Sequence, residues 1–172
     1  MRVVLEANRL APERVAGIVL VDGSRAGSGD PDAAEAAARS QIEQVGYAAW
    51  AESLFRQMFF QSTPASERLV ARAVRQSAEI GAALWPRMAR WDAATLEPAL
   101  AAVHAPVLVI QTTSRNAQMQ RAPMQTGQTT PWLELLKEKL KSVRIEVLPG
   151  LGHFPQLEAP ERVNRLIEEF CR

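Results

Sequence analysis

The sequence has 172 residues, a formal net charge of +1 and 47% hydrophobic residues. It therefore predicts a globular protein with enough apolar mass for a core, and the near-neutral charge gives no reason to expect nucleic acid as a partner. A single cysteine, Cys171, excludes an intrachain disulfide framework and a thiolate metal cluster. No apolar run approaches the ~20 residues of a membrane span. Charges come too early at the N-terminus for a signal peptide, so we expect a cytoplasmic protein without a membrane partner.

The first thirty residues predict a helix and then a strand. Residues 3–10 carry a short helical apolar face that stops before Pro12. Residues 17–21 read Gly-Ile-Val-Leu-Val, a continuous apolar run suited to a strand covered on both faces. The polar run Asp-Gly-Ser at 22–24 ends this strand, and the glycine-containing residues 25–31 indicate a loop.

The next seventy residues have a helical pattern rich in alanine. Residues 32–60 predict one long helix, which the Ser-Thr-Pro run at 62–64 ends. A second helix is expected at residues 65–83. A third helical region is expected at residues 85–100, with an interruption near Asp92.

The last seventy residues alternate between strands and helices. Residues 107–111 predict a second buried strand, and the long polar segment 112–130 after it predicts a loop of the kind that is usually functional or mobile. Pro131 begins a helix at the position that proline favours. A third strand is expected at residues 145–148 and a closing helix at 160–170.

A histidine follows the third predicted strand. The strand ends in a Pro-Gly-Leu-Gly turn, and His153 comes directly after it. Histidine titrates near neutral pH, so a histidine on a tight loop at the carboxyl end of a strand is well placed for proton transfer. Taken alone, the residue is better explained as a loop histidine that only makes hydrogen bonds.

Three segments resemble the α/β-hydrolase family. Residues 152–163 read Gly-His-Phe-Pro-Gln-Leu-Glu-Ala-Pro-Glu-Arg-Val, which resembles the loop that carries the family's catalytic histidine. Residues 12–24 resemble its sixth strand with the turn beyond, and residues 105–111 resemble its seventh strand. Their order and spacing fit the family, and the resemblance covers only the second half of its fold.

The resemblance implies an α/β fold. We expect a three-stranded parallel sheet, a partial α/β-hydrolase fold, with an inserted helical cap. The core would comprise residues 1–30 and 101–172, and the cap residues 31–100. The sequence contains no Gly-x-Ser-x-Gly motif, the elbow that carries the family's nucleophile. Our expectation is a truncated chain that begins inside the helix leaving this elbow, without the elbow or the oxyanion-hole loop.

The resemblance also assigns candidate catalytic roles. His153 would be the general base. Residues 112–116, which follow the second strand, contain no carboxylate to orient it, and Asp22 after the first strand is the other position that family members use. Asn116 is the alternative orienting group. It could hold the ring but could not stabilise an imidazolium charge.

The nucleophile is the least secure assignment. Ser24, Ser28 and Ser114 would all lie at the same edge of the sheet as His153, although none lies on an elbow. An ordinary loop serine is the better explanation of each. Cys171 lies on the closing helix, away from that edge. The candidates for binding substrate are Trp85, Met88, Trp91 and Phe154, and core packing of the cap is the alternative explanation for its aromatic residues.

Two functions follow from these expectations. The first is a serine-hydrolase-type esterase that acts on small carboxylic esters, lacks the usual elbow and needs no metal or organic cofactor. The alternative is a catalytically inactive, truncated remnant that serves as an oligomerising or binding module. The first strand should have an open edge, because the sequence has no fifth strand to cover it, and residues 18–21 include no proline or charge to block pairing. We therefore expect a homodimer or a higher even oligomer through that edge.

Overall fold

The fold was analysed in a computed structural model that describes residues 1–116, 118 and 120–172. The chain forms two compact units. We call Met1–Ser24 together with Glu97–Arg172 the sheet unit, and Arg25–Leu96 the helical unit. The predicted division into a hydrolase core and a cap concerns the roles of these units, and it stays a prediction.

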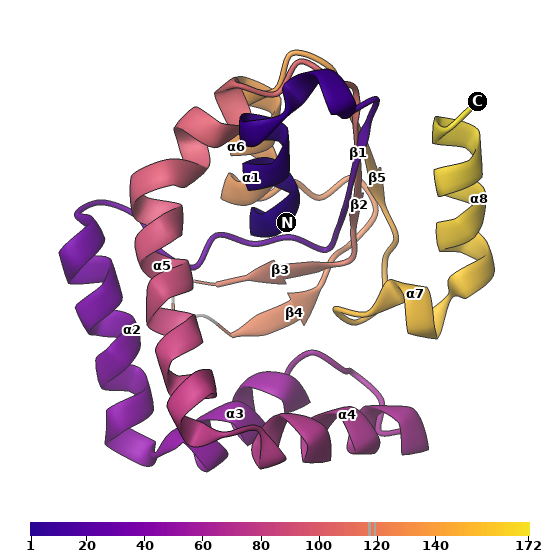
Figure 1. The fold of residues 1–172 in the computed structure, drawn as a ribbon. Helices are drawn as coiled ribbons and strands as arrows, with labels where there is room; N and C mark the ends of the chain where they lie inside the picture. The colour runs from indigo at the N-terminus through magenta and orange to yellow at the C-terminus, as the bar shows by residue number, and fades with distance from the viewer. Residues whose placement is uncertain (117, 119) are drawn as a thin grey trace. The chain divides into compact units, whose positions relative to one another are not determined.

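The sheet unit is built on three parallel strands, as predicted. These are β1 (Ile18–Val21), β2 (Val107–Gln111) and β5 (Val143–Val147), in the order β1-β2-β5 (Figure 1). Every residue of the central strand β2 is buried, which explains its continuous apolar run. The third strand begins two residues earlier than predicted and ends one residue earlier. Because the strands are parallel, their carboxyl ends meet at one edge of the sheet.

Helices cover both faces of this sheet. On one face, Val163 of α8 (Pro160–Phe170) packs in a buried cluster with Leu108, Ile110 and Leu148. Figure 1 shows α1 (Arg2–Leu10) and α6 (Pro131–Lys139) on the opposite face. A short 3-10 helix, Pro12–Arg14, connects α1 to β1.

The segment predicted as a long polar loop contains a hairpin, so that prediction is wrong in part. Strands β3 (Thr113–Arg115) and β4 (Arg121–Pro123) pair antiparallel in a second, two-stranded sheet. The sequence of this segment gives little sign of pairing, because it is polar and does not alternate clearly. A one-turn helix, α7 (Pro155–Glu158), was also not predicted; it follows the histidine loop.

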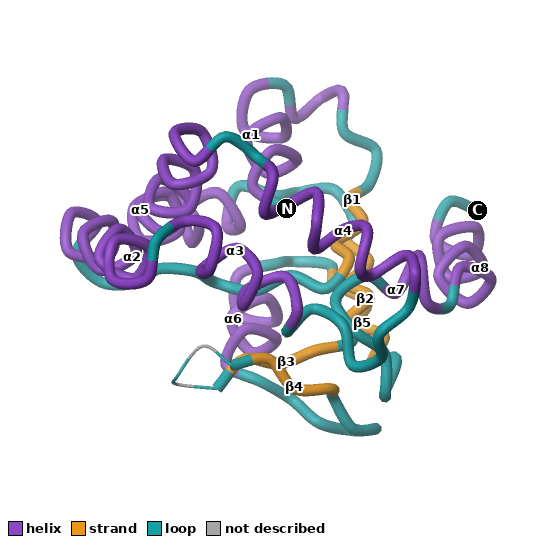
Figure 2. The backbone as a smooth tube through the Cα atoms, turned by 90° about the horizontal axis from the view of Figure 1, so that it is seen from below, coloured by secondary structure: helices purple, strands orange, loops and turns teal. Residues whose placement is uncertain are grey.

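The helical unit contains α2 (Pro31–Val45), α3 (Tyr47–Arg56), α4 (Pro64–Arg75) and most of α5 (Ala78–Ala101). Helices α3 and α4 lie side by side (Figure 2). Helix α4 begins with a capping box, in which the side chains of Thr63 and Ser66 each accept a hydrogen bond from the other residue's backbone N–H.

Three predicted helix boundaries in this unit are wrong. The single helix expected at 32–60 is two helices, because Gly46 takes φ +80° and ends α2. The helix expected to reach residue 83 ends at Arg75. Helix α5 continues through Asp92, whose buried carboxylate accepts a hydrogen bond of 2.6 Å from the Ala26 N–H. Ala26 lies 66 residues before Asp92, so the sequence around Asp92 gives no sign of this contact.

Candidate catalytic site

The carboxyl edge of the sheet brings His153 and Asp22 together. Asp22 directly follows β1, and His153 follows β5 after a five-residue connection. The His153 Nδ1 lies 2.6 Å from Asp22 Oδ2. The sequence analysis gave Asp22 as the candidate for orienting His153, and this distance allows that contact; the catalytic roles of both residues remain predictions.

The Asp22 carboxylate accepts five hydrogen bonds. Its Oδ1 accepts from the backbone N–H groups of Thr112 (2.8 Å) and Thr113 (2.7 Å). Its Oδ2 accepts from the Thr113 hydroxyl (2.5 Å) and from Arg121 Nη1 (3.0 Å), as well as from His153. Burial alone would raise the pKa of Asp22. The hydrogen bonds from His153 and Thr113, the charge of His153 and the Thr112 N–H outweigh burial and lower that pKa. The carboxylate is therefore ionised at neutral pH.

The backbone of Asp22 is unusual. Its φ of +44° lies in the left-handed region, and no other non-glycine residue in the described part of the chain has a positive φ. Aspartate tolerates this conformation better than most residues, at a cost of about 1–2 kcal/mol. The surrounding hydrogen bonds hold the strained turn, and the strain lies at the point where the side chain is directed toward His153.

The hydrogen bond to Asp22 assigns the proton on the His153 ring. An ionised carboxylate only accepts, so Nδ1 must carry a hydrogen, and in the neutral ring Nε2 then presents a lone pair. The side chain is 24% exposed, so it is accessible to small molecules. Its loop is held from two sides: the Thr112 hydroxyl donates to the Gly152 carbonyl (2.7 Å), and the Gly152 N–H donates to Glu158 (2.9 Å).

The structure does not bring a predicted nucleophile to the histidine. Ser24 is half-buried, two residues after Asp22, and neither Ser24 nor Ser114 hydrogen-bonds to His153 in the described part of the chain. Ser114 lies on β3 between Thr113 and Arg115, and side chains alternate along a strand. It therefore occupies the hairpin face opposite the Thr113 side chain that contacts Asp22. Ser28 belongs to the helical unit and is exposed.

The alternative orienting group does not contact the histidine. Both polar atoms of the Asn116 side chain bond to Gln120, the amide to its side chain (3.0 Å) and the oxygen to its backbone N–H (2.9 Å). The structure thus gives Asn116 a local role in the hairpin segment and favours Asp22. Cys171, discounted from the sequence, is an exposed free thiol at the end of α8.

The predicted substrate-binding residues lie in both units. Trp85, Met88 and Trp91 are half-buried on α5 in the helical unit. The Trp85 ring lies 5.5 Å from that of Trp50, in keeping with packing inside the unit. Phe154 belongs to the sheet unit, and its ring meets the His153 ring edge-on at 5.1 Å. A substrate-binding role for these four residues stays a prediction.

Sequence reasoning missed two residues of this site. Thr113 and Arg121 both contact Asp22, and both lie on the hairpin that was expected to be a loop. Arg115 pairs with Arg121 across the two strands. Burial, together with the like charges of Arg121 and Arg2, lowers the pKa of Arg115 to about 10. No group of three or more histidine, cysteine, aspartate or glutamate side chains could hold a metal among the described residues.

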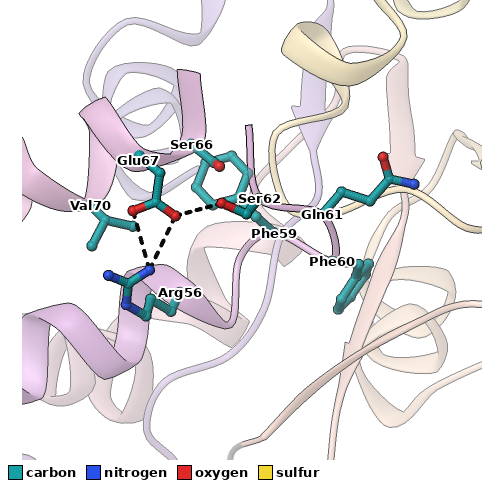
Figure 3. Close-up of a pocket in the computed structure, with 8 residues that line it drawn as sticks. All are labelled: Arg56, Phe59, Phe60, Gln61, Ser62, Ser66, Glu67 and Val70. Atoms are coloured by element: carbon teal, nitrogen blue, oxygen red, sulfur yellow. Dashed lines mark hydrogen bonds and ion pairs between the residues drawn. The ribbon is translucent and has the colours of Figure 1, made fainter. Parts of the chain in front are cut away.

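A small pocket in the helical unit offers a second candidate site. It has a volume of about 110 Å³ and lies at the junction of α3 and α4 (Figure 3). Its charged and hydroxyl groups are already engaged, since Arg56 pairs with Glu67 (3.3 Å) and the Ser62 hydroxyl donates to Glu67 (2.7 Å). The Ser66 hydroxyl belongs to the capping box of α4. This pocket therefore offers no reactive group comparable with His153.

The fold and this site define an α/β protein with a histidine–aspartate pair at the carboxyl edge of a parallel sheet. The sequence model of the alpha/beta hydrolase family matches residues 2–166. The chain belongs to the alpha/beta hydrolase family, and the predicted resemblance is confirmed. A search of curated proteins gives no match.

The solved structures with the same fold are longer than this chain. A hydrolase from Pseudomonas aeruginosa matches with a TM-score of 0.70 at 18% identity, over 97% of this chain and 59% of that one. The enol-lactonase from Burkholderia xenovorans matches with a TM-score of 0.63 at 18% identity, over 97% and 60%. An esterase from Exiguobacterium antarcticum matches with a TM-score of 0.65 at 15% identity, over 95% and 61%. The chain thus spans about 60% of the length of these proteins.

Proposed function

We propose that this chain supplies the general base of a serine-hydrolase-type site that hydrolyses small carboxylic esters. His153 is the base and Asp22 the group that orients it. The observation that carries the proposal is the hydrogen bond of 2.6 Å between Nδ1 and a buried, ionised carboxylate, in a chain of the alpha/beta hydrolase family. An esterase and an enol-lactonase are among the similar structures, which supports an ester as the substrate class.

The chemistry follows from the tautomer. Nε2 takes the proton of an attacking hydroxyl while that oxygen bonds to the ester carbonyl carbon. The resulting imidazolium is stabilised by the Asp22 carboxylate. It then gives its proton to the leaving alkoxide as the ester C–O bond breaks. Water repeats the sequence, and the acyl group leaves as a carboxylic acid.

Ser24 is the first candidate for the attacking hydroxyl. It follows Asp22 by two residues, in the sheet unit and beyond the carboxyl end of β1, and it is half-buried. Ser114 is the second candidate, weakened by its position on the other face of the hairpin. If Ser24→Ala no longer forms the covalent acyl intermediate in rapid-mixing experiments, Ser24 is the nucleophile. If its kinetics are unchanged, Ser114→Ala is the next variant to test.

The experiment is hydrolysis of short-chain nitrophenyl esters by the purified chain. A His153→Ala variant should lose at least about 10²-fold in kcat/KM, the lower range for a general base. The matched control is His104→Ala, which removes the other histidine of the chain, an exposed side chain beside Lys141. A folded His153→Ala variant with full activity, or an equal loss in both variants, would remove His153 from the mechanism.

A second candidate function is a binding or oligomerising module, favoured by two surfaces of the sheet unit. Val3 and Leu10 of α1 are 84% and 74% exposed. Strand β1 pairs with β2 on one side only within the described residues. A symmetric dimer that pairs β1 with its copy would satisfy that edge. Sedimentation at micromolar concentration tests it: a dimer supports the module, whereas a well-folded monomer opposes it.

A further inference from the structure

A buried arginine shares the oxygen that orients the histidine. Arg121 Nη1 lies 3.0 Å from Asp22 Oδ2, the atom that also accepts from His153 Nδ1. The Arg121 side chain is only 3% exposed. It also donates to the Thr113 hydroxyl oxygen, and that hydroxyl donates to the same Oδ2. Three donors therefore converge on one carboxylate oxygen.

The hairpin explains how the arginine reaches this position. Arg121 pairs with Arg115, and Thr113 pairs with Pro123. Paired residues in antiparallel strands share a face, as do residues two apart in one strand. Thr113, Arg115 and Arg121 thus belong to one face of the hairpin, and that face meets Asp22.

The burial of Arg121 argues against a role in binding substrate. Its guanidinium contacts the Asp22 carboxylate and the Thr113 hydroxyl, and almost none of it reaches the surface. A substrate anion would have to displace Asp22 to reach it. Burial lowers the pKa of Arg121, and the charge of Asp22 partly offsets this effect.

We propose that Arg121 is a positioning residue: it holds the Asp22 carboxylate directed at His153, and its fixed charge sets the pH below which the histidine stops acting as a base. A cation beside the pair opposes formation of the imidazolium, because like charges repel. Other charged groups around the pair are Arg115 on β3, Arg2 on α1 and Glu158 on α7. Arg121 bonds directly to Oδ2. The catalytic part of this inference rests on the proposed function, whereas the titration does not.

The first test is an NMR titration of the ring protons of His153. The chain has two histidines, so a His104→Gln variant assigns both signals. In Arg121→Met the midpoint of the His153 titration should rise by about one pH unit relative to wild type, the lower range for a charged neighbour. Arg121→Gln is a second uncharged variant if the methionine variant does not fold. Arg121→Lys keeps the charge and should leave the midpoint close to that of wild type.

The matched control is Arg115→Met, which removes the cation paired with Arg121 in the same hairpin. It should shift the midpoint less than Arg121→Met does. An unchanged or lowered midpoint in the uncharged Arg121 variants overturns the proposal. Equal shifts of the His153 midpoint in Arg115→Met and Arg121→Met also overturn it. The general positive charge of the hairpin, and not the contact between Arg121 and Asp22, would then explain the effect.

The second test uses ester hydrolysis. In Arg121→Met the acid limb of the kcat profile should move to higher pH by the same amount, while KM stays within about twofold, because the residue does not touch substrate. A selective rise in KM for esters that carry a carboxylate would instead make Arg121 a binding residue and refute the positioning role. If the wild-type chain hydrolyses no ester, the proposed function fails, and the NMR titration still decides the role of Arg121.

Discussion

Replacing Asp22 by asparagine should disrupt both stability and base function. The amide NH2 must occupy the position of one carboxylate oxygen, and both positions face donors. The Oδ1 position faces two backbone N–H groups, and the Oδ2 position faces Thr113, Arg121 and His153. In the first orientation both bonds from the backbone N–H groups are lost; in the second the bond from Arg121 is lost, and those with Thr113 and His153 must reverse direction.

The size of the effect follows from burial. Each hydrogen bond to a charged group contributes about 1.5–3 kcal/mol. Removing one partner of a buried ion pair costs about 3–5 kcal/mol, and Arg121 would remain buried without the Asp22 charge. We expect Asp22→Asn to lower the free energy of unfolding by about 3–5 kcal/mol. His153 would also turn to the tautomer that accepts at Nδ1, which leaves Nε2 protonated and unable to act as a base.

Urea unfolding followed by circular dichroism measures the stability. The control is Asp30→Asn, because Asp30 caps α2 and asparagine caps helices about as well as aspartate. Its free energy of unfolding should stay within about 0.5 kcal/mol of wild type. A loss below about 1 kcal/mol in Asp22→Asn would show that the five hydrogen bonds do not hold the site as described.

Three further outcomes are expected. The pKa of Asp22 is lowered in the folded protein, so its ionised form contributes stability above about pH 4, near the pKa of the unfolded chain, and this contribution is lost as the pH falls further. The difference in free energy of unfolding between wild type and Asp22→Asn, measured in urea, should therefore shrink below about pH 4 and not above it. Gly81→Ala should destabilise the helical unit, although alanine normally stabilises a helix by about 1 kcal/mol, because a Cβ there would lie 2.2 Å from the Tyr47 ring; a higher thermal midpoint would contradict this. Val19→Pro should abolish a β1-edge dimer, since Ile18 and Asp22 donate toward β2 and the N–H of Val19 therefore points to the outer edge; a dimer that persists in sedimentation would place the interface elsewhere.

The sheet could be predicted because its signals are local. The buried strand β2 has a continuous apolar sequence, and α8 begins at Pro160 as expected from the favoured first helical position. The link between Asp22 and His153 was implied by the resemblance to the α/β-hydrolase family, whose strand order puts the carboxyl ends of these strands at one edge. These elements are specified by composition and periodicity over a few residues.

The rest of the site depends on contacts that the sequence does not display. Arg121 lies in a polar segment where an arginine usually faces solvent, and only the β3–β4 pairing turns it toward Asp22. The interruption expected near Asp92 is absent, and the partner of its side chain, the Ala26 N–H, is 66 residues away in the sequence. Gly46 is the exception. This glycine could have indicated the end of α2 from the sequence, but the alanine-rich pattern on both sides of it favoured one continuous helix.

The central claim is that Asp22 holds the proton of His153 on Nδ1 and leaves Nε2 as the base. The most direct measurement is the long-range 1H–15N spectrum of the uniformly 15N-labelled chain at a pH where the ring is neutral, with His104→Gln used for assignment. The account predicts a protonated Nδ1 and an unprotonated Nε2 for His153 in wild type, and the reverse in Asp22→Asn. A wild-type ring protonated at Nε2, or a spectrum that Asp22→Asn leaves unchanged, would contradict it.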